Sequence, residues 1–170
     1  MKRLTLIRHA DADWKNASVP DFERPLNKRG LGEAEAMGKL LLDQALVPDL
    51  LLASAARRTQ QTSEILARKL NLASRRVKAA EGLYLALPDD ILTLVRATGP
   101  RVQHLVIVGH NPGISDLARS LAPKEMTIAE LTTAAACTLT FLTRTWATIG
   151  PPASRAVQYE PPSKLFSLFT

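Results

Sequence analysis

The chain has 170 residues, of which 46% are hydrophobic and 22% charged, and its net charge is +6 at neutral pH. This size and composition predict one globular domain over residues 1–170. We expect no membrane span, because no run approaches the roughly 18 apolar residues that a span needs, and no secretory signal. The single cysteine, Cys137, excludes an internal disulfide and a cysteine-based metal cluster, and it favours a reducing cytoplasm.

The positive charge is scattered along the sequence, and aromatic residues make up only 5% of it. Nucleic-acid binding typically needs a basic stripe interleaved with stacking aromatic residues, and the sequence has none. Two interpretations of the charge stay open: an ordinary solvated surface, or attraction of an acidic or phosphorylated partner. We expect no nucleic-acid or membrane partner, and a monomer.

The hydrophobic pattern predicts alternating strands and helices. In chain order, we expect strands over residues 3–8, 49–53, 76–80, 104–108, 134–142 and 155–159 (the last at an edge), and helices over 28 to about 45, 55 to about 70, 88 to about 98 and 114–121. Asn27 and Ser54 are the expected N-caps of the first two helices. Leu31 is expected on the buried face of the first helix.

This alternation is typical of the α/β class. We predict a single three-layer α/β/α domain with a mostly parallel central sheet and helices on both faces. Right-handed crossovers bring the carboxyl ends of parallel strands to one edge, where ligands bind in such sheets. Polar residues follow three of these strands: Arg8 with His9, Ser54 with Arg57, and His110. The long polar loop over residues 10–26 is expected to hang over His9.

Two histidines and two arginines at one point suit a phosphoryl group. The planar, permanently charged forks of Arg8 and Arg57 match phosphate oxygens and would stabilise the charge that develops in the transition state. Arg57 would lie in the first turn of a helix, whose free N–H groups also attract anions. His9, kept unprotonated by its cationic neighbours, would attack phosphorus and hold it covalently. His110 would contact the phosphoryl oxygens.

Each of these residues also has an ordinary structural interpretation. His9 could be a hydrogen-bonding residue at the end of a strand. Arg57, beside Arg58, could belong to a solvated helix face. His110 could lie in a turn that needs its neighbouring glycines. Their shared position at one sheet edge favours the functional interpretation.

Three segments together resemble the histidine phosphatase (phosphoglycerate-mutase-like) superfamily: residues 6–10 (LIRHA), 54–62 (SAARRTQQT) and 108–113 (VGHNPG). The Arg-His-Ala form of the first segment, the Arg24-Pro25-Leu26 segment and the small size resemble the SixA-type phosphohistidine phosphatases. The resemblance covers residues 3 to about 122. It implies a phosphoglycerate-mutase-like fold, a phosphorylated nucleophile at His9, and no metal or cofactor. It also implies a phosphate pocket completed by Arg8, Arg57 and His110, with Arg24 and Asn111 as weaker candidates for substrate contacts.

The sequence departs from the superfamily at one position. Many members carry a Glu or Asp proton donor after the third strand, where this chain has Leu85. An alkoxide leaving group needs a proton, whereas an imidazole, with a pKa of about 6.5, can arrive already protonated. We therefore expect phosphohistidine on a protein as the substrate. Two alternatives stay open: a phosphatase of small phosphate esters such as sugar phosphates, with Asp11 or Asp13 as donor, and a phosphate-binding module without turnover.

A metal enzyme is a further alternative. His9, Asp11, Asp13 and His110 are of the types that bind Zn, Mn or Fe, although two nearby arginines would repel a cation. Outside the site we expect a buried Cys137 thiol and an exposed His104. Trp14, in the long loop, is expected either to anchor that loop or to contact substrate.

Overall fold

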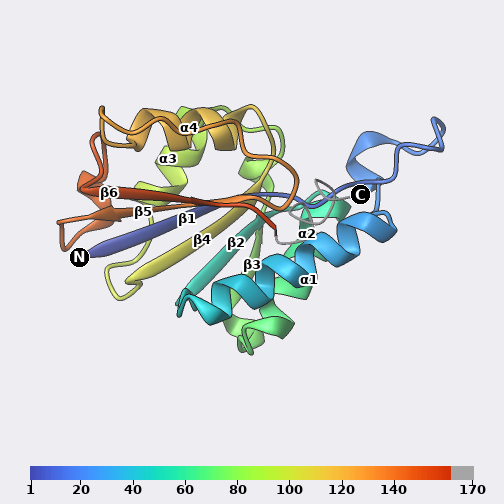
Figure 1. Cartoon of the computed structure of the whole chain (residues 1–170), viewed down its shortest axis with the longest axis horizontal. Helices are drawn as coiled ribbons and strands as arrows, with labels where there is room; N and C mark the ends of the chain where they lie inside the picture. The colour runs from blue at the N-terminus through green and yellow to red at the C-terminus, as the bar shows by residue number, and fades with distance from the viewer. Residues whose placement is uncertain (162–170) are drawn as a thin grey trace, which may run out of the picture.

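The computed structural model describes residues 1–161 and is drawn in Figure 1. Its strands are β1 (Lys2–Arg8), β2 (Leu50–Ser54), β3 (Val77–Ala80), β4 (His104–Gly109), β5 (Ala136–Phe141) and β6 (Arg155–Tyr159). Its α-helices are α1 (Lys28–Asp43), α2 (Arg57–Lys69), α3 (Pro88–Arg96) and α4 (Gly113–Leu121). Short 3₁₀ turns form η1 (Asp21–Glu23), η2 (Ser74–Arg76), η3 (Glu81–Leu83) and η4 (Trp146–Thr148). The predicted order of strands and helices is confirmed.

Within the described residues the strands form a single sheet in the order β3-β2-β4-β1-β5-β6. The first four strands in this order run parallel, β5 is antiparallel to β1, and β6 is antiparallel to β5. Figure 1 shows α1 and α2 on one face of the sheet, with α3 and α4 on the other. The predicted three-layer arrangement and the edge position of β6 are both confirmed.

The side chains of β4 explain why helices cover both faces. Leu105 and Ile107 belong to the core cluster that includes α3 and α4, and Val106 and Val108 belong to the cluster that includes α1 and α2. All four are fully buried. Successive side chains of a strand point to opposite faces, so an unbroken apolar run requires cover on both sides.

The register of the parallel strands places the candidate residues together. Arg8 at the end of β1 lies opposite Gly109 at the end of β4. His9 and His110, the next residues of the two strands, therefore leave the sheet side by side. Ala53 of β2 pairs with Val108, so that Ser54 ends its strand at the same edge.

Two glycines let loops approach this edge closely. A Cβ added at Gly30 would lie 2.0 Å from the Asp11 carbonyl oxygen, and one added at Gly113 would lie 2.0 Å from the Ala86 carbonyl oxygen. The loop after β1 thus rests on the start of α1. The loop before α3 rests in the same way on the start of α4.

Some local predictions were wrong. Helix α2 begins at Arg57, with Ala56 as its N-cap, because Ser54 completes β2. Leu31 is exposed, since the buried face of α1 is formed instead by residues such as Ala34 and Met37. His104 is buried, and its Nε2 lies 2.8 Å from the Thr5 hydroxyl on the neighbouring strand.

The predictions for Cys137, for the domain extent and for membrane spans have separate outcomes. The buried position of Cys137 is confirmed. The single domain over residues 1–170 stays a prediction, and residues 162–170 lie outside the described part. No helix among residues 1–161 combines the length and apolar character needed to span a membrane.

Candidate active site

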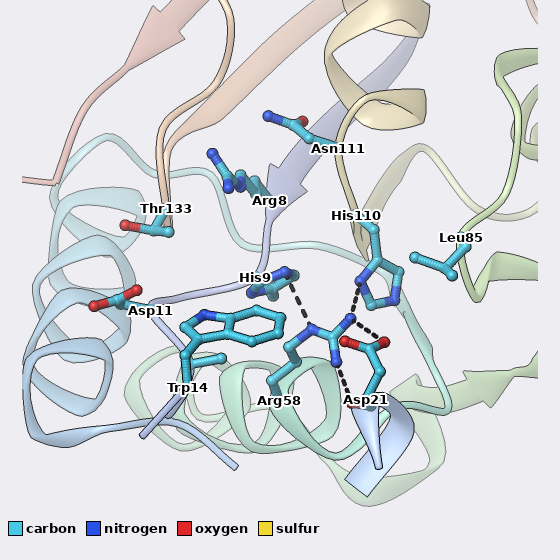
Figure 2. A pocket seen from close by; sticks show the side chains of 11 residues that line it. Arg8, His9, Asp11, Trp14, Asp21, Arg58, Leu85, His110, Asn111 and Thr133 are labelled. Carbon is cyan, nitrogen blue, oxygen red and sulfur yellow. Dashed lines mark hydrogen bonds and ion pairs between the residues drawn. The ribbon is translucent and has the colours of Figure 1, made fainter. Parts of the chain in front are cut away.

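A cavity of about 240 Å³ opens where β1 and β4 end. Figure 2 shows the two histidines and Arg58 at its floor, with Trp14, Asp21 and Leu85 around them. The lining residues come from the strand ends, the loop after β1, the start of α2 and two further loops: Arg8, His9, Asp11, Ala12, Trp14, Asp21, Arg58, Leu85, His110, Asn111 and Thr133.

His9 is held with one ring nitrogen toward the pocket arginine. Its backbone N–H donates to the Gly109 carbonyl at 3.0 Å. Its Nδ1 lies 2.7 Å from the Ala10 carbonyl, and Arg58 Nε donates to its Nε2 at 3.3 Å. An arginine always donates, so Nε2 is the acceptor and Nδ1 carries the proton. Nε2 therefore carries no proton, and its lone pair points toward Arg58.

The tautomer of His110 follows from the same reasoning. Arg58 Nη2 donates to its Nδ1 at 3.3 Å, so its Nε2 carries the proton and donates to the Ser54 hydroxyl at 2.8 Å. The two imidazole rings lie edge to face, with centroids 5.2 Å apart. The hydroxyl of Ser54, predicted as a helix cap, accepts from His110 Nε2 and also from the Ala56 amide.

Both imidazoles are kept neutral. The pKa of His9 is lowered to about 4, mainly by burial and also by the charges of Arg58 and Arg8, against the opposing effect of the Ala10 carbonyl. Burial, followed by the nearby His9 and Arg58, lowers the pKa of His110 to about 3. The expected unprotonated state of His9 is therefore found, but loss of hydration contributes more to it than the cationic neighbours do.

The arginine that joins Arg8 in the pocket is Arg58, and the prediction of Arg57 was wrong. Arg57 is exposed, whereas Arg58 is only 3% exposed and lines the cavity. Because α2 starts at Arg57, its second residue faces the sheet edge. Neighbouring helical residues point about 100° apart, so an error of one position exchanges a buried side chain for a solvated one.

Asp21 is a pocket residue that the sequence analysis missed. Its backbone carbonyl accepts from Arg58 Nη1 at 2.6 Å, and its Oδ2 accepts from Arg58 Nη2 at 3.1 Å and from the Tyr84 hydroxyl at 2.6 Å. Partial burial acts to raise the pKa of Asp21, but the Tyr84 and Arg58 hydrogen bonds outweigh it and bring the pKa below its ordinary value. Asp21 is in η1 within the irregular loop, where no periodic pattern marks it.

Three other residues predicted for the site differ in whether they line the cavity. Arg8 lines the cavity and donates from Nη1 to the Leu131 carbonyl, while its buried Nε has no hydrogen-bond partner among residues 1–161. Asn111 lines the cavity and donates to the same carbonyl at 2.9 Å. Arg24 lies outside the lining. Its Nη1 donates to the Asp13 carbonyl at 3.3 Å, and its guanidinium carbon lies 4.7 Å from the centre of the Trp14 ring, so that Arg24 supports the loop.

Leu85 lines the cavity mouth at the position where a carboxyl was expected from the superfamily pattern. It is 57% exposed and has a φ of 49°, in the left-handed region. A branched residue adopts this conformation at a cost of about 1–2 kcal/mol. Trp14, also 57% exposed, packs against Arg24 and so anchors the loop; it also lines the cavity, and its contact with substrate stays a prediction.

The proposed metal ligands do not converge. Asp13 is outside the cavity lining, and its carboxylate accepts from the Lys15 amide. Asp11 accepts from the Asn27 side chain. Among residues 1–161, no three His, Cys, Asp or Glu side chains are grouped so that they could hold a metal ion.

An open α/β sheet with two neutral imidazoles and two arginines at its strand ends defines a site for a phosphoryl group. Comparison with known proteins agrees. A family model described as histidine phosphatase superfamily (branch 1) matches residues 4–83. The phosphohistidine phosphatase SixA of Escherichia coli is 32% identical over 125 residues, which are 71% of this chain and 74% of that protein.

A solved structure of the protein histidine phosphatase SixA complexed with tungstate superposes with a TM-score of 0.75, at 27% identity, over 95% of this chain and 99% of that one. An uncharacterised chloroplastic protein of Arabidopsis thaliana is 27% identical over 129 residues, which are 71% of this chain but only 59% of that protein. The chain belongs to the histidine phosphatase superfamily, has its phosphoglycerate-mutase-like fold, and is a phosphatase.

Proposed function

We propose that this phosphatase removes phosphate from phosphohistidine on a protein, through a covalent phosphohistidine at His9. The observation that supports the covalent step is the state of the His9 imidazole. Its unprotonated Nε2 faces the cavity, its Nδ1 proton is held by the Ala10 carbonyl, and arginines stand on either side. A neutral imidazole with a fixed tautomer is a competent nucleophile toward phosphorus.

The cationic floor would bind the phosphoryl oxygens. Arg58 presents its guanidinium to the cavity, and the buried Nε of Arg8, which has no partner among residues 1–161, can donate to a phosphoryl oxygen. A bound dianion would add negative charge to that of Asp21 and would therefore raise the pKa of His110. His110 could then donate from Nδ1 as charge develops on the oxygens.

The cavity mouth favours a protein substrate and a nitrogen leaving group. The volume of about 240 Å³ is below the roughly 300–1,000 Å³ of ordinary small-molecule pockets, so it suits a phosphoryl group whose carrier stays outside. Leu85 and Trp14 flank the entrance with apolar surface, which suits a side chain better than a sugar bearing many hydroxyls. Asp21 is held ionised and is poorly suited to protonate an alkoxide.

The test is phosphate release from three substrates: a phosphohistidine-bearing protein, a phosphoserine peptide and a sugar phosphate, each in EDTA. We expect release from the phosphohistidine protein, a far lower rate with the two esters, and loss of activity in His9→Ala. Equal rates on the esters would instead favour a small-molecule phosphatase. Saturable phosphate binding without release would favour a binding module, and loss of activity in EDTA that Mn or Zn restores would point to a metal enzyme.

A further inference from the structure

A second hollow adjoins the cavity at His9. Its volume is about 370 Å³, and its lining comes from the end of β1 and the loop before β5: Arg8, Glu130, Leu131, Thr132 and Thr133. Arg8 and Thr133 also line the cavity at His9, so the two spaces meet at these side chains. Figure 2 shows Thr133 and Asp21 on opposite sides of His9. A substrate whose phosphoryl group lies at His9 therefore has room for a neighbouring part of its chain in this second hollow, the side groove.

The loop that forms the side groove is fixed against the strand ends. The Leu131 carbonyl accepts from Arg8 Nη1 at 3.1 Å and from Asn111 Nδ2 at 2.9 Å. Three residues further along, the Ala134 N–H donates to the His9 carbonyl at 3.2 Å. Leu131 and Ala134 are both fully buried. The position of the groove relative to His9 is therefore set by the fold before any substrate binds.

Glu130 is the carboxylate of the side groove that is open to a substrate. It is exposed, its Oε1 accepts from Asn111 Nδ2 at 3.1 Å, and its Oε2 has no hydrogen-bond partner among residues 1–161. The nearby Glu160 differs, because its two oxygens accept from Thr132 and Gln158. Glu130 lies outside the lining of the cavity at His9, so its charge acts on the part of a substrate that lies beyond the phosphoryl group.

The charge of Glu130 favours a cationic substrate group in the side groove. Arg8 would oppose such a group in the empty site, but a phosphoryl dianion bound at Arg8 offsets that charge. A lysine or arginine side chain can lay its methylene stem along the groove and place its cation at the carboxylate. A glutamate in the same place would meet a like charge and be disfavoured. The net charge of the whole chain, +6, favours the opposite order, so a preference for lysine needs a local cause.

We propose that the side groove binds a residue that flanks the phosphohistidine in the substrate protein, and that Glu130 makes the phosphatase prefer lysine or arginine there. The inference rests on the proposed function, since it needs a phosphohistidine carried by a polypeptide. The phosphoryl group occupies the cavity at His9, and the substrate chain passes over Arg8 into the groove. Glu130 determines specificity and takes no part in the transfer of the phosphoryl group.

The test uses one phosphohistidine-bearing protein in three versions. They differ only in the two residues that flank the phosphohistidine, which are lysine, alanine or glutamate. We expect kcat/KM for phosphate release by the full chain to be highest with lysine and lowest with glutamate, by about fivefold at each step, the upper end for an exposed ion pair. The differences should shrink as salt rises from about 50 mM to about 0.5 M, because salt screens exposed charges.

Variants of Glu130 show whether this carboxylate is the cause. Glu130→Gln keeps an oxygen that can accept from Asn111 but removes the charge, so the preference for lysine should disappear. Glu130→Lys should reverse it and make the glutamate version the best substrate. A residue that only supported the loop would change kcat/KM for all three versions alike. Glu125→Gln is the matched control, because Glu125 is an exposed carboxylate of the same loop that lines neither space, and it should keep the wild-type order.

The possible failures are distinguishable. Equal kcat/KM values of the wild type on the three versions would overturn this inference and leave the proposed function standing. A preference for lysine that persists in Glu130→Gln would show that another group causes it. If the wild type releases phosphate from none of the three versions but does so from a sugar phosphate, the proposed function fails, and this inference fails with it.

Discussion

A single guanidinium organises the floor of the cavity at the scale of individual residues. Arg58 donates to both imidazoles and to the backbone and side chain of Asp21, while only 3% of it is exposed. Hydrogen bonds from a charged donor are roughly twice as strong as neutral ones. Such a group both fixes the two histidine tautomers and presents positive charge where phosphoryl oxygens would bind.

Arg58→Ala should lower kcat by about 10²- to 10³-fold, as expected when one donor to developing negative charge is removed. Arg57→Ala provides the comparison, because the neighbouring side chain is solvated and lies outside the cavity lining. We expect it to keep near wild-type activity. Steady-state kinetics on a phosphohistidine protein would measure both, and a greater loss in Arg57→Ala than in Arg58→Ala would refute this description of the pocket.

Leu85 offers a test of leaving-group preference. Leu85→Glu would place a carboxyl at the cavity mouth, beside apolar surface that disfavours its ionised form and raises its pKa. A protonated carboxyl can donate to an alkoxide leaving group, which typically contributes 10²- to 10⁴-fold. We expect hydrolysis of a phosphoserine peptide to rise, with Leu85→Gln unchanged because an amide transfers no proton. The ratio of ester to phosphohistidine rates measures the effect.

The sequence predicted the two pocket histidines better than their partners. His9 and His110 follow largely apolar strands, so their position at one edge was predictable from the pattern. The choice between Arg57 and Arg58 depended on the first residue of α2, which the pattern does not locate to one position. Asp21 is in an irregular loop, and the Thr5 partner that allows His104 to be buried is on another strand. Neither contact is visible in a linear pattern.

At the scale of elements, the site depends on how closely loops approach the helices beneath them. Gly30, in the first turn of α1, leaves room for the Asp11 carbonyl, and Gly113, at the start of α4, leaves room for Ala86, next to Leu85. These contacts hold the loops that carry Asp11 and Leu85, both of which line the cavity. The sequence predicted the helices themselves, but it did not indicate which of their glycines meet a neighbouring backbone.

Gly30→Ala should destabilise the protein by about 1–3 kcal/mol, because the new Cβ would lie 2.0 Å from a backbone oxygen that has to move. Gly32→Ala is the matched substitution on the same helix, with nothing within 4 Å of the added atom. It should stabilise the protein by about 0.5–1 kcal/mol, through higher helix propensity and a less flexible unfolded chain. Midpoints of urea unfolding compare the two, and equal shifts would argue against the close approach.

At the scale of the whole molecule, all three histidines are buried and neutral. The pKa of His9 and that of His104 are lowered to about 4, and that of His110 to about 3, in each case mainly by burial. In the unfolded chain a histidine titrates near pH 6.5. Between these values the unfolded chain binds more protons than the folded one, so acid favours unfolding.

The free energy of unfolding should therefore be constant, as far as histidines are concerned, between pH 7 and 8, and should decrease as the pH falls from about 6.5 toward 4. The expected loss by pH 5 is up to about 2 kcal/mol for each buried histidine. Chemical denaturation at a series of pH values measures it. Stability that stays level from pH 7 down to pH 5 would show that the imidazoles are not buried in neutral form.

The engagement of Arg58 by Asp21 also bears on how the product departs. An inorganic phosphate ion in the cavity competes with a carboxylate that already accepts from Nη2 and a carbonyl that already accepts from Nη1. It also meets the repulsion of that carboxylate's charge. Free phosphate is therefore expected to be a weak inhibitor, and a stronger one in Asp21→Asn, which equilibrium competition against substrate would measure. By this expectation, a negatively charged neighbour of Arg58 would keep the spent anion from occupying the site between turnovers.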